Sequence, residues 1–590
     1  LVYTHFSMRI IFALPLLCLF SCGTTEGDNE FGLLEETVES ATEIDWLSYD
    51  EDIFDAAKLQ NKLVLLEVGA NWCHWCHVMD DSTYANAEVQ EYLNENFILS
   101  REDQDSRPDL YTAYKPWGWP AIIVQDEDGN DIIRLRGYQE RKKFLKILKE
   151  VVANPVPLKD EQIFQEEYVA SNVLDEQFEA RVDHEKGGYP WKNKFLTAAG
   201  IIQGLKMNDN QKMRTWTLLT IQQSFLLVDP EWSGVYQYSA KKSWNNQHYE
   251  KLLKTQAEYI KAYSIFGSYT QYGAAIVRAE GIKDYCDRFF GNSNPLYWNS
   301  QNADLISGVH SEEYFKLSDE KRLQQGIPSV DEKIYLKENA LLADALLYLW
   351  AATGDAEYFE KADKMLTEIL SKYKSGNGLY VREIGKADVF SFEDNRALLD
   401  FIMKMYQLSG EDKYLKEAED LGISIQMNFE MVRGFVSVMG KGKLLQSYVA
   451  LDNLNAALTF NLLYHLSAKE EFLIVAKTAY QNTDKASLHE KVSYLPLLQM
   501  AEEQLAEEPF HAVFLNDGKQ KKLGQQLYAQ LLLHPSQYFT FEWLSLDEMS
   551  AEQEMMYGGL PAGTLFMCTS SYCSAPMYDV ESLKTFLKNI

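Results

Sequence analysis

Two patterns of apolar and polar positions divide the chain. Up to about residue 154, short apolar runs containing β-branched residues alternate with amphipathic helical stretches. From residue 160 to 505 the helical period prevails. We therefore expect a multidomain protein with an α/β region at 41–154 and an all-α region at 160–505, joined by the proline-containing linker 153–157.

The α/β region begins with a strand that leads directly into a cysteine motif. Residues 62–68 are almost continuously apolar, which is typical of a strand buried on both faces. Further strands are predicted at 98–100, 121–125 and 131–135, and helices at 53–60, 78–97 and 140–152. This order of elements, with Pro120 just before the third strand, predicts a thioredoxin-like fold.

The all-α region contains an internal repeat. The segment 353–362 returns at 409–418, an offset of 56 residues, and a weaker copy follows at 466–476. Each copy places a tight turn between two helices, so the repeat unit is a helical hairpin. Because single hairpins cannot bury their apolar faces, we expect them to stack into a solenoid or close into a ring.

Loops that combine glycine with an aromatic residue separate these hairpins. Such loops line a central pocket in one interpretation and are only turns with packing aromatics in the other. The last residues, 506–590, change character, with strands predicted at 511–516 and 538–544 around a helix at 520–533. The glycine–aromatic loops lie at 188–189, 234–236, 378–380 and 434–435.

The N-terminus has the pattern of an export signal. Met8 and Arg9 precede a short apolar run that ends at Ser21-Cys22-Gly23, similar to a bacterial lipobox. We predict a signal peptide at 1–22, a lipid-modified mature N-terminus at Cys22, and a flexible tether at 23–40. An ordinary signal peptide is the alternative. The protein is then expected in the cell envelope, in the periplasm or at the outer membrane, attached to the membrane through lipid alone.

Composition narrows the function. The chain has 590 residues with 56 Lys and Arg against 87 Asp and Glu, a formal net charge of −31. Such an acidic surface repels phosphate backbones, so we expect no nucleic-acid partner. The 35 Tyr, 29 Phe and 12 Trp can fill a large core, which excludes a disordered or small disulfide-stapled protein.

The candidate chemistry lies in the C-x-x-C motif. Cys73 and Cys76 stand at the junction of the predicted strand and a helix, where unpaired N–H groups favour a thiolate. Protonated His74 or His77 would add to this effect. We predict that Cys73 is the exposed attacking thiol and Cys76 the resolving thiol, and that protein thiols or disulfides are the partners.

Two other interpretations of the motif remain open. The string 73–77 is also C-x-x-C-H, the pattern of c-type haem attachment, and cysteine pairs also hold zinc. A haem site does not explain Pro120, and a zinc site lacks further ligands at suitable spacing, so we expect no cofactor and no metal. Cys286 is predicted to be a buried apolar residue, and Cys568 with Cys573 a structural or dormant pair.

Several strings resemble one family, the thioredoxin-domain proteins fused to a six-hairpin (α/α)6 toroid, which includes the spermatogenesis-associated thioredoxin-like protein. The resemblance implies a thioredoxin fold in which the proline at 120 is cis and faces the disulfide. It also implies thiol–disulfide chemistry at Cys73 and Cys76, flanked by Trp72, Trp75 and Trp119. The strings that carry it are C-H-W-C-H-V-M at 73–79, L-N-E-N-F at 93–97, R-P-D at 107–109 and G-W-P at 118–120.

The resemblance continues through the helical region. Similar strings occur at 187–195, 236–253, 392–395, 455–463 and 568–576. Because toroid relatives include epimerases and glycoside hydrolases, an alternative function is carbohydrate binding or processing, with a glycan as partner and placed acid/base groups. The candidate toroid pocket consists of Tyr189, Tyr238, Trp244, His248, Glu250, Asp304, Asn339, Glu393 and Asp394.

Overall fold

The computed structural model describes residues 44–158, 174–386, 389–442 and 444–589. The predicted signal peptide, Cys22 and the tether at 23–40 lie outside the described residues. None of the described helices combines the length and the apolar character needed to cross a bilayer. Residues 42–590 group into one compact unit.

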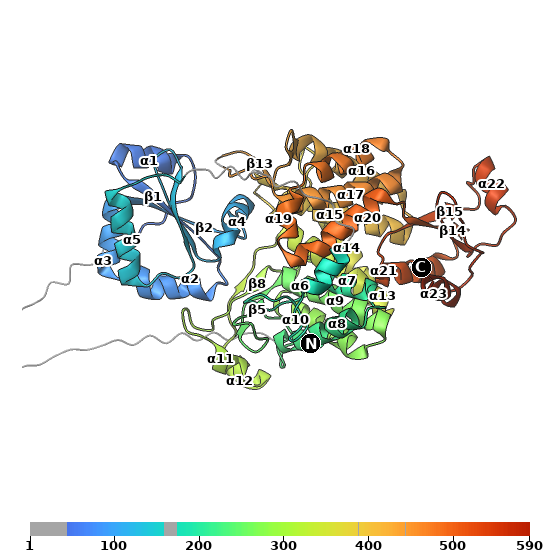
Figure 1. The fold of residues 1–590 in the computed structure, drawn as a ribbon, viewed down its shortest axis with the longest axis horizontal. Coiled ribbons are helices and arrows are strands. Elements are labelled where there is room, and N and C mark those ends of the chain that lie inside the picture. Colours follow the sequence, from blue (N-terminus) through green and yellow to red (C-terminus); the bar gives the residue numbers. More distant parts are fainter. Residues whose placement is uncertain (1–43, 159–173, 387–388, 443, 590) are drawn as a thin grey trace, which may run out of the picture. The chain divides into compact units, whose positions relative to one another are not determined.

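A four-stranded sheet organises the α/β region, in the order β2-β1-β3-β4 (Figure 1). The central strand β1 (Leu63–Gly69) pairs in parallel with β2 (Phe97–Asp103) and antiparallel with β3 (Ala121–Gln125). The edge strand β4 (Asp131–Arg136) is antiparallel to β3. The side chains of β1 are almost all buried, as expected for a central strand with helices on both faces.

Helices pack on this sheet as the sequence pattern predicts. The helix α1 (Asp52–Gln60) buries Ile53 and Phe54 in one core, and α5 (Arg141–Ala153) buries Phe144 and Leu148 in another. The peptide bond between Trp119 and Pro120 is cis, directly before β3. The expected thioredoxin-like order of elements is therefore confirmed.

The single helix predicted at 78–97 is wrong. The structure has α2 (His74–Val78), a π-helical turn at Met79–Tyr84, and a separate helix α3 (Ala87–Asn96). The break has a local cause, because Asn86 caps α3 by accepting a hydrogen bond from the Val89 N–H. The sequence pattern also gave no sign of α4 (Pro108–Tyr114), a short helix after β2.

Six helices of the described residues form a closed inner ring. Each contacts the next, and the last contacts the first again. An outer helix packs against each inner one, so the arrangement is the (α/α)6 toroid that the family resemblance implies. The inner helices are α7 (Ala198–Lys206), α9 (Leu253–Thr270), α13 (Leu336–Thr353), α15 (Phe392–Ser409), α17 (Ala450–Ser467) and α20 (Leu495–Ala506). The outer helices are α6 (Leu174–Arg181), α8 (Gln211–Ser224), α10 (Gly273–Phe289), α14 (Ala356–Lys372), α16 (Asp412–Phe429) and α18 (Glu470–Gln481).

The repeated turns join inner to outer helices. Gly354 ends α13 and Gly410 ends α15, both with positive φ, a conformation that glycine adopts without steric cost. Ala468 takes the same place after α17. The sequence repeat therefore marks three of the hairpins, α13–α14, α15–α16 and α17–α18.

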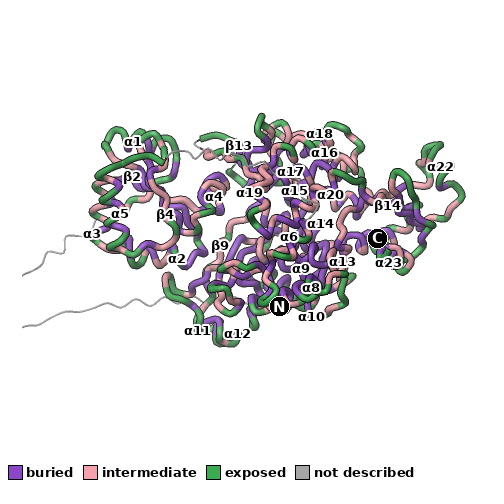
Figure 2. Tube along the Cα trace, in the orientation of Figure 1, coloured by how far each residue is buried: buried purple, intermediate pink, exposed green. Residues whose placement is uncertain are grey.

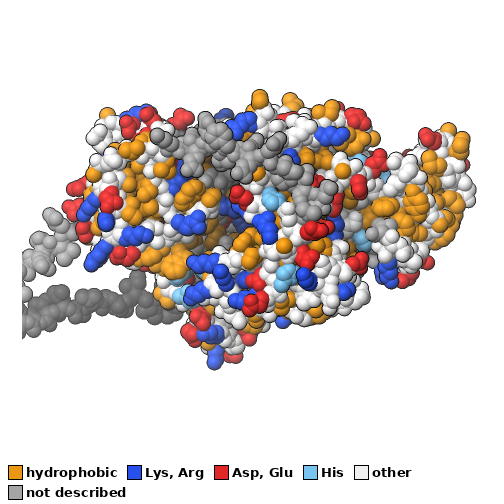
Figure 3. Space-filling view, in the orientation of Figure 1, with side chains coloured by type: hydrophobic (Ala, Val, Ile, Leu, Met, Phe, Trp, Pro, Cys, Tyr) orange, Lys and Arg blue, Asp and Glu red, His pale blue; other side chains and the backbone are white. Residues whose placement is uncertain are grey.

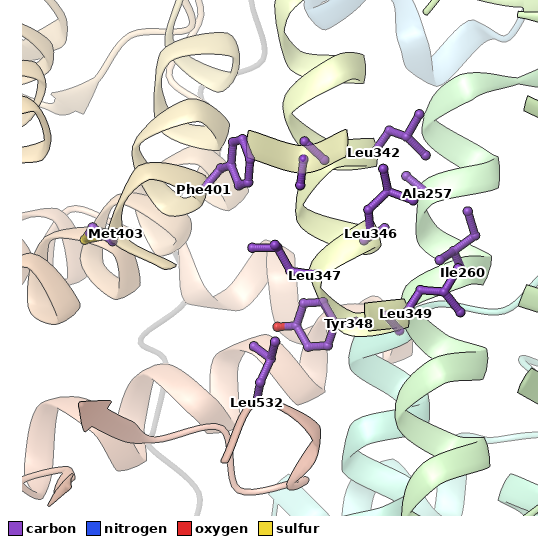
Figure 4. Packing of buried hydrophobic residues seen from close by; sticks show 14 of the residues in the cluster. Ala257, Ile260, Leu342, Leu346, Leu347, Tyr348, Leu349, Phe401, Met403 and Leu532 are labelled. Carbon is purple, nitrogen blue, oxygen red and sulfur yellow. The ribbon is translucent and has the colours of Figure 1, made fainter. Parts of the chain in front are cut away.

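The inner helices carry the core of the helical region. They appear as buried stretches in Figure 2, while much of the outer surface is exposed. Leu342, Leu346 and Leu349 of α13 face Ala257 and Ile260 of α9 (Figure 4). Because α13 contacts helices on both sides, most of its circumference is apolar, as expected for a buried helix.

Buried amides in the first turns of inner helices hold the glycine–aromatic loops. Asn395 accepts a hydrogen bond from the Tyr380 N–H and donates to the Tyr380 carbonyl. Asn453 makes the same pair of bonds to Phe435. Asn339 does so to Tyr297, which lies in another loop before an inner helix. The aromatic residues of these loops are buried, so their packing role is confirmed.

The C-terminal region is α/β, as predicted. Its three-stranded sheet has the order β15-β14-β16, formed by β15 (Phe539–Ser545), β14 (Phe510–Asn516) and β16 (Leu565–Cys568). The helix α21 (Lys521–Leu533) lies between β14 and β15 in sequence and contacts α13. Cys568 and Cys573 form a disulfide, and Cys286 is buried and free.

Shorter elements complete the described chain. They are α11 (Glu312–Phe315), α12 (Asp319–Gln325), α19 (Lys485–His489), α22 (Ala551–Tyr557), α23 (Val580–Leu587), and the strands β5 (Tyr238–Ser239), β6 (Gln247–His248), β7 (Lys251–Leu252), β8 (Ser300–Gln301), β9 (Val330–Asp331), β10 (Val389–Ser391), β11 (Glu430–Met431), β12 (Gly434–Phe435) and β13 (Val438–Gly440). Of these, β7, β8 and β9 form a small sheet next to the redox motif.

Candidate functional site

The two motif cysteines lie at the start of α2. Cys73 is the N-cap residue, and its Sγ accepts a hydrogen bond from the Cys76 N–H at 3.1 Å. The two cysteines form a disulfide. The free N–H groups at a helix N-terminus stabilise negative charge, so reduction would leave Cys73 in a position that favours a thiolate.

The disulfide is covered, contrary to the expectation that Cys73 is exposed. Cys73 is 4% exposed and Cys76 5%. Both belong to a small apolar cluster with Trp72 and with Leu252 from β7 of the helical region, and Trp119 packs against it. The sequence pattern could not predict this, because the covering residue comes from a distant part of the chain.

A buried charge cluster anchors the strand that carries the cover. Lys251, next to Leu252, forms an ion pair with Asp229 at 2.8 Å, and Arg322 forms a second at 2.7 Å. Burial, only partly offset by Asp229, lowers the pKa of Lys251 to about 8. The two cations overcome the effect of burial on Asp229 and lower its pKa to about 2.

Asp304 of the helical region binds both histidines of the motif. Its Oδ1 lies 2.8 Å from His74 Nδ1, and its Oδ2 lies 3.1 Å from His77 Nδ1. Burial disfavours the charged forms, but the hydrogen bonds and charges prevail: the pKa of His77 is raised and that of Asp304 is lowered. The carboxylate therefore favours an imidazolium next to the cysteines.

A second contact runs through Asp105, which follows β2. Its Oδ2 accepts hydrogen bonds from Trp72 Nε1 at 2.7 Å and from Asn299 Nδ2 at 3.0 Å. Its carbonyl accepts from Arg382 Nε at 2.7 Å. Burial raises the pKa of the Asp105 carboxyl. Asp105 thus ties the tryptophan that precedes Cys73 to the helical region.

The mouth of the toroid, where the inner helices begin, is filled by α4. Tyr111 of α4 lies within 5.2 Å of Lys254 and 5.9 Å of Lys337, measured from each ammonium to the ring centre. Both lysines stand in the first turns of inner helices. The cavity that remains beside Tyr111 measures about 20 Å³, which is room for about one water molecule.

Ion pairs engage two of the carboxylates at this mouth, Glu393 and Asp394. Glu393 pairs with Lys337, which lowers the pKa of Glu393 to about 2. Asp394 Oδ1 accepts from Arg382 Nη1 at 2.7 Å. Burial and the nearby charge of Glu393 raise the pKa of Asp452 to about 8. A carboxyl with that pKa holds a proton at neutral pH.

A larger cavity of about 690 Å³ lies against the redox motif. It brings together Tyr238, His248, Glu250 and Asp304 from the predicted toroid pocket. From the α/β region, His74, Trp75 and Arg136 line it. The predicted residues thus divide between this cavity and the filled mouth.

Three other predicted pocket residues are packed inside the protein. Tyr189 is buried and its hydroxyl hydrogen-bonds to Thr197. Trp244 donates from Nε1 to the Lys186 carbonyl at 2.8 Å. Asn339 is fully buried and hydrogen-bonds to the backbone of Tyr297, so it belongs with Asn395 and Asn453, the buried amides that hold loop backbone.

Sequence reasoning missed several residues of the site. They are Asp105, Tyr111, Leu252, His310 and Arg382, whose roles depend on contacts between segments far apart in the chain. Tyr111 and Arg382 do not belong to a recognisable sequence motif. In the described part of the chain, no group of three His, Cys, Asp or Glu side chains is arranged to hold a metal ion.

The chain is similar to several curated proteins. Spermatogenesis-associated protein 20 of Mus musculus is 24% identical over 310 residues, which is 44% of this chain and 39% of that protein. The match thus spans about two-fifths of that relative. The uncharacterized protein B0495.5 of Caenorhabditis elegans is 20% identical over 702 residues, covering 92% of this chain and 94% of that protein.

Further matches concern the two regions separately. The disulfide bond reductase DsbH of Chlamydia pneumoniae is 21% identical over 131 residues, 20% of this chain and 79% of that protein. A crystal structure of D-mannose isomerase covers 58% of this chain and all of that protein, with 15% identity and a TM-score of 0.45. Residues 34–154 match the family Thioredox_DsbH, described as a protein of unknown function, DUF255. The chain is therefore homologous to spermatogenesis-associated protein 20 and carries, at residues 34–154, a domain of the Thioredox_DsbH family.

Proposed function

We propose that the protein is a thiol–disulfide oxidoreductase that cycles Cys73 and Cys76 between dithiol and disulfide. The observation that carries the proposal is the Cys73–Cys76 disulfide at the N-terminus of α2, beside the cis peptide bond of Pro120. The similarity of the α/β region to a disulfide bond reductase supports it.

The exchange proceeds in two steps. The Cys73 thiolate attacks a partner disulfide, forming a mixed disulfide and releasing one partner thiolate. The Cys76 thiolate then attacks Cys73 Sγ, which releases the second partner thiolate and closes the Cys73–Cys76 disulfide. The partner is reduced by two electrons and the protein dithiol is oxidised by two. The reverse direction uses the same steps in opposite order.

The cover over the disulfide sets a condition on this reaction. Leu252 and Trp119 pack in one apolar cluster with the two buried cysteines, so a partner sulfur reaches Cys73 only when this cover withdraws. The sheet β7–β8–β9 and the Asp304 contacts then decide how readily that happens. In this proposal the helical region is a binding and gating module for the redox motif.

A trapping experiment tests the function. A Cys76→Ala variant lacks the resolving thiol, so it should accumulate mixed disulfides through Cys73 with partner disulfides, seen by mass spectrometry. A Cys73→Ala variant should trap none. The matched control is Cys286→Ala, which removes a buried thiol outside the motif. Equal trapping by Cys73→Ala would contradict the assignment of Cys73 as nucleophile.

We also propose that the protein is anchored in the cell envelope through a lipid on Cys22. The motif Leu19-Phe20-Ser21-Cys22-Gly23 supports this. Expression with a labelled fatty acid should label the wild-type chain, and Cys22→Ala should abolish the label. Equal labelling of both chains would contradict a lipid anchor on that cysteine.

The alternative is that the helical region binds a polar ligand such as a glycan. The filled mouth does not favour it, because Tyr111 occupies the space and ion pairs engage Glu393 and Asp394. The 690 Å³ cavity does favour a ligand, because Tyr238, His248 and Glu250 line an open space there. A ligand site in the helical region is therefore best sought at this cavity.

A further inference from the structure

The cavity beside the redox motif has one wall made by the motif itself. His74 and Trp75 stand between the two cysteines in sequence, and both line the cavity. The opposite wall comes from the segment 238–250 of the helical region. Its volume of about 690 Å³ falls in the range that binds small ligands.

The rim of this cavity is basic. Arg136, Lys192 and Lys241 line it, all three are exposed, and none forms an ion pair with a carboxylate in the described part of the chain. On the face that Figure 3 draws, acidic and basic side chains are both present over most of the surface. In a chain of net charge −31, three unpaired cations around one cavity favour an anionic ligand.

A buried carboxylate on the opposite wall requires a hydrogen-bond donor. Glu250 is 4% exposed, and its Oε2 has no hydrogen-bond partner among the described residues. The His248 Nδ1 atom lies 3.9 Å from Glu250 Oε1, which is beyond hydrogen-bond distance. A buried carboxylate oxygen without a donor costs free energy, so a ligand ammonium or hydroxyl group that reached it would be bound favourably.

Aromatic rings line the space between the basic rim and Glu250. Tyr238 and His248 stack with ring centres 4.2 Å apart, and Trp191 and Tyr249 also line the cavity. These rings provide an apolar surface for the carbon chain of a ligand. The cavity thus combines a basic rim, an apolar surface and a buried carboxylate in its wall.

We propose that this cavity binds a low-molecular-weight zwitterionic thiol compound, such as a short cysteine-containing peptide, as the exchange partner of Cys73 and Cys76. The proposal rests on the proposed thiol–disulfide function. Ligand carboxylates contact Arg136, Lys192 and Lys241, and the ligand ammonium donates to Glu250. The sulfur then lies toward the turn formed by the motif.

The position of Glu250 connects ligand binding to the cover. Glu250 precedes Lys251 and Leu252, the strand whose leucine lies on the disulfide. A ligand bound at Glu250 therefore contacts the segment that has to withdraw. In the exchange, two protein thiols reduce one ligand disulfide to two ligand thiols and form the Cys73–Cys76 disulfide, so atoms and electrons balance without another reactant.

Binding can be tested with a ligand that cannot exchange. S-methylglutathione carries carboxylates and an ammonium but has no free thiol. Titration calorimetry with the full chain should detect its binding, and Lys192→Ala/Lys241→Ala or Glu250→Gln should weaken it at least tenfold. The charge-matched control Lys477→Ala/Lys522→Ala changes two exposed lysines elsewhere and should leave binding unchanged. Equal affinity in all variants, or no binding to the wild type, would overturn the proposal.

A kinetic comparison separates this inference from the function on which it rests. The reduced wild-type protein should reduce glutathione disulfide at least tenfold faster than the uncharged 2-hydroxyethyl disulfide. The Lys192→Ala/Lys241→Ala variant should lose that preference, and the control Lys477→Ala/Lys522→Ala should keep it. If both disulfides react equally in every variant, the ligand site is wrong and the function stands. A third outcome is that neither disulfide reacts even though dithiothreitol reduces the Cys73–Cys76 disulfide. That result would overturn exchange with small disulfides and therefore this proposal. The trapping experiment with Cys76→Ala would still decide the proposed thiol–disulfide function.

Discussion

The α/β region meets the helical region at two places that differ in chemistry. At the redox motif, the helical region supplies Asp304 to the two histidines and Leu252 to the disulfide. At the toroid mouth the α/β region supplies the contacting residue instead, because Tyr111 of α4 lies between charged residues of the inner helices. The first contact places a carboxylate and an apolar side chain next to the redox motif, whereas the second places an aromatic ring among charged groups.

The two contacts also differ in the space that they leave for a ligand. A toroid mouth filled by a tyrosine and closed ion pairs has little room for a substrate. One buried carboxylate oxygen without a hydrogen-bond partner among the described residues, Glu250 Oε2, belongs to a residue that lines the larger cavity beside the redox motif. Glu338 Oε2 and Asp394 Oδ2 at the mouth also lack such a partner, but the space beside them is small. The same helical scaffold thus provides a structural contact at one place and an open site at another.

The largest expected effect on stability comes from removing Arg382 at the toroid mouth. Arg382 is buried and contacts Asp394 and Glu338, besides the Asp105 carbonyl. Arg382→Ala leaves these carboxylates without their cation, and we expect a loss of about 3–5 kcal/mol in the free energy of unfolding. Urea denaturation measures it. The exposed Arg214→Ala is the control and should change little; an equal effect of both would refute the mouth as a joining contact.

A smaller effect is expected at the cover. Leu252→Ala removes a buried side chain from the disulfide cluster, which should cost about 2 kcal/mol in the free energy of unfolding. It should also speed alkylation of reduced Cys73 severalfold, measured by mass spectrometry with iodoacetamide. The exposed Leu59→Ala should change neither quantity. An unchanged alkylation rate would show that Leu252 does not limit access.

The smallest effect concerns Asp304 and depends on pH. Because the pKa of His77 is raised, its stabilising contribution is present below about pH 6.5 and is lost as the pH rises through the folded value. The lowered pKa of Asp304 gives a contribution present above about pH 3.8 and lost as the pH falls through its folded value.

The two contributions overlap between about pH 4 and pH 6.5. Asp304→Asn should therefore lower the free energy of unfolding by about 1 kcal/mol near pH 5.5, and by less at pH 8.5. Denaturation curves at both pH values measure the difference. The exposed Asp209→Asn should show no such pH dependence. A loss that is equal at both pH values would contradict a charged Asp304–His77 pair.

The elements that follow from local pattern could be predicted. The run at 121–125 forms β3 with the predicted bounds, and the repeat at 353–362 and 409–418 marks the hairpin turns. Apolar periodicity and glycine at a positive φ are local signals, so they predict structure without knowledge of distant contacts.

The candidate site could be predicted only in part. The C-x-x-C motif located the reactive pair, but the burial of Cys73 depends on Leu252, and the partner of His74 lies 230 residues away. The helix predicted at 78–97 failed because Asn86 caps a new helix inside the apolar period. Contacts between segments far apart carry no local signal, and they decide which polar groups are paired.

The central claim is that Cys73 and Cys76 form a working redox couple. It is tested most directly by equilibrating the full chain with dithiothreitol buffers of graded ratio, quenching, alkylating, and measuring each cysteine by mass spectrometry. The account predicts that Cys73 and Cys76 titrate together as one two-electron couple, with Cys568 and Cys573 as a second pair scored in the same sample. The account would be contradicted if the folded protein kept Cys73 and Cys76 in the same oxidation state in all buffers.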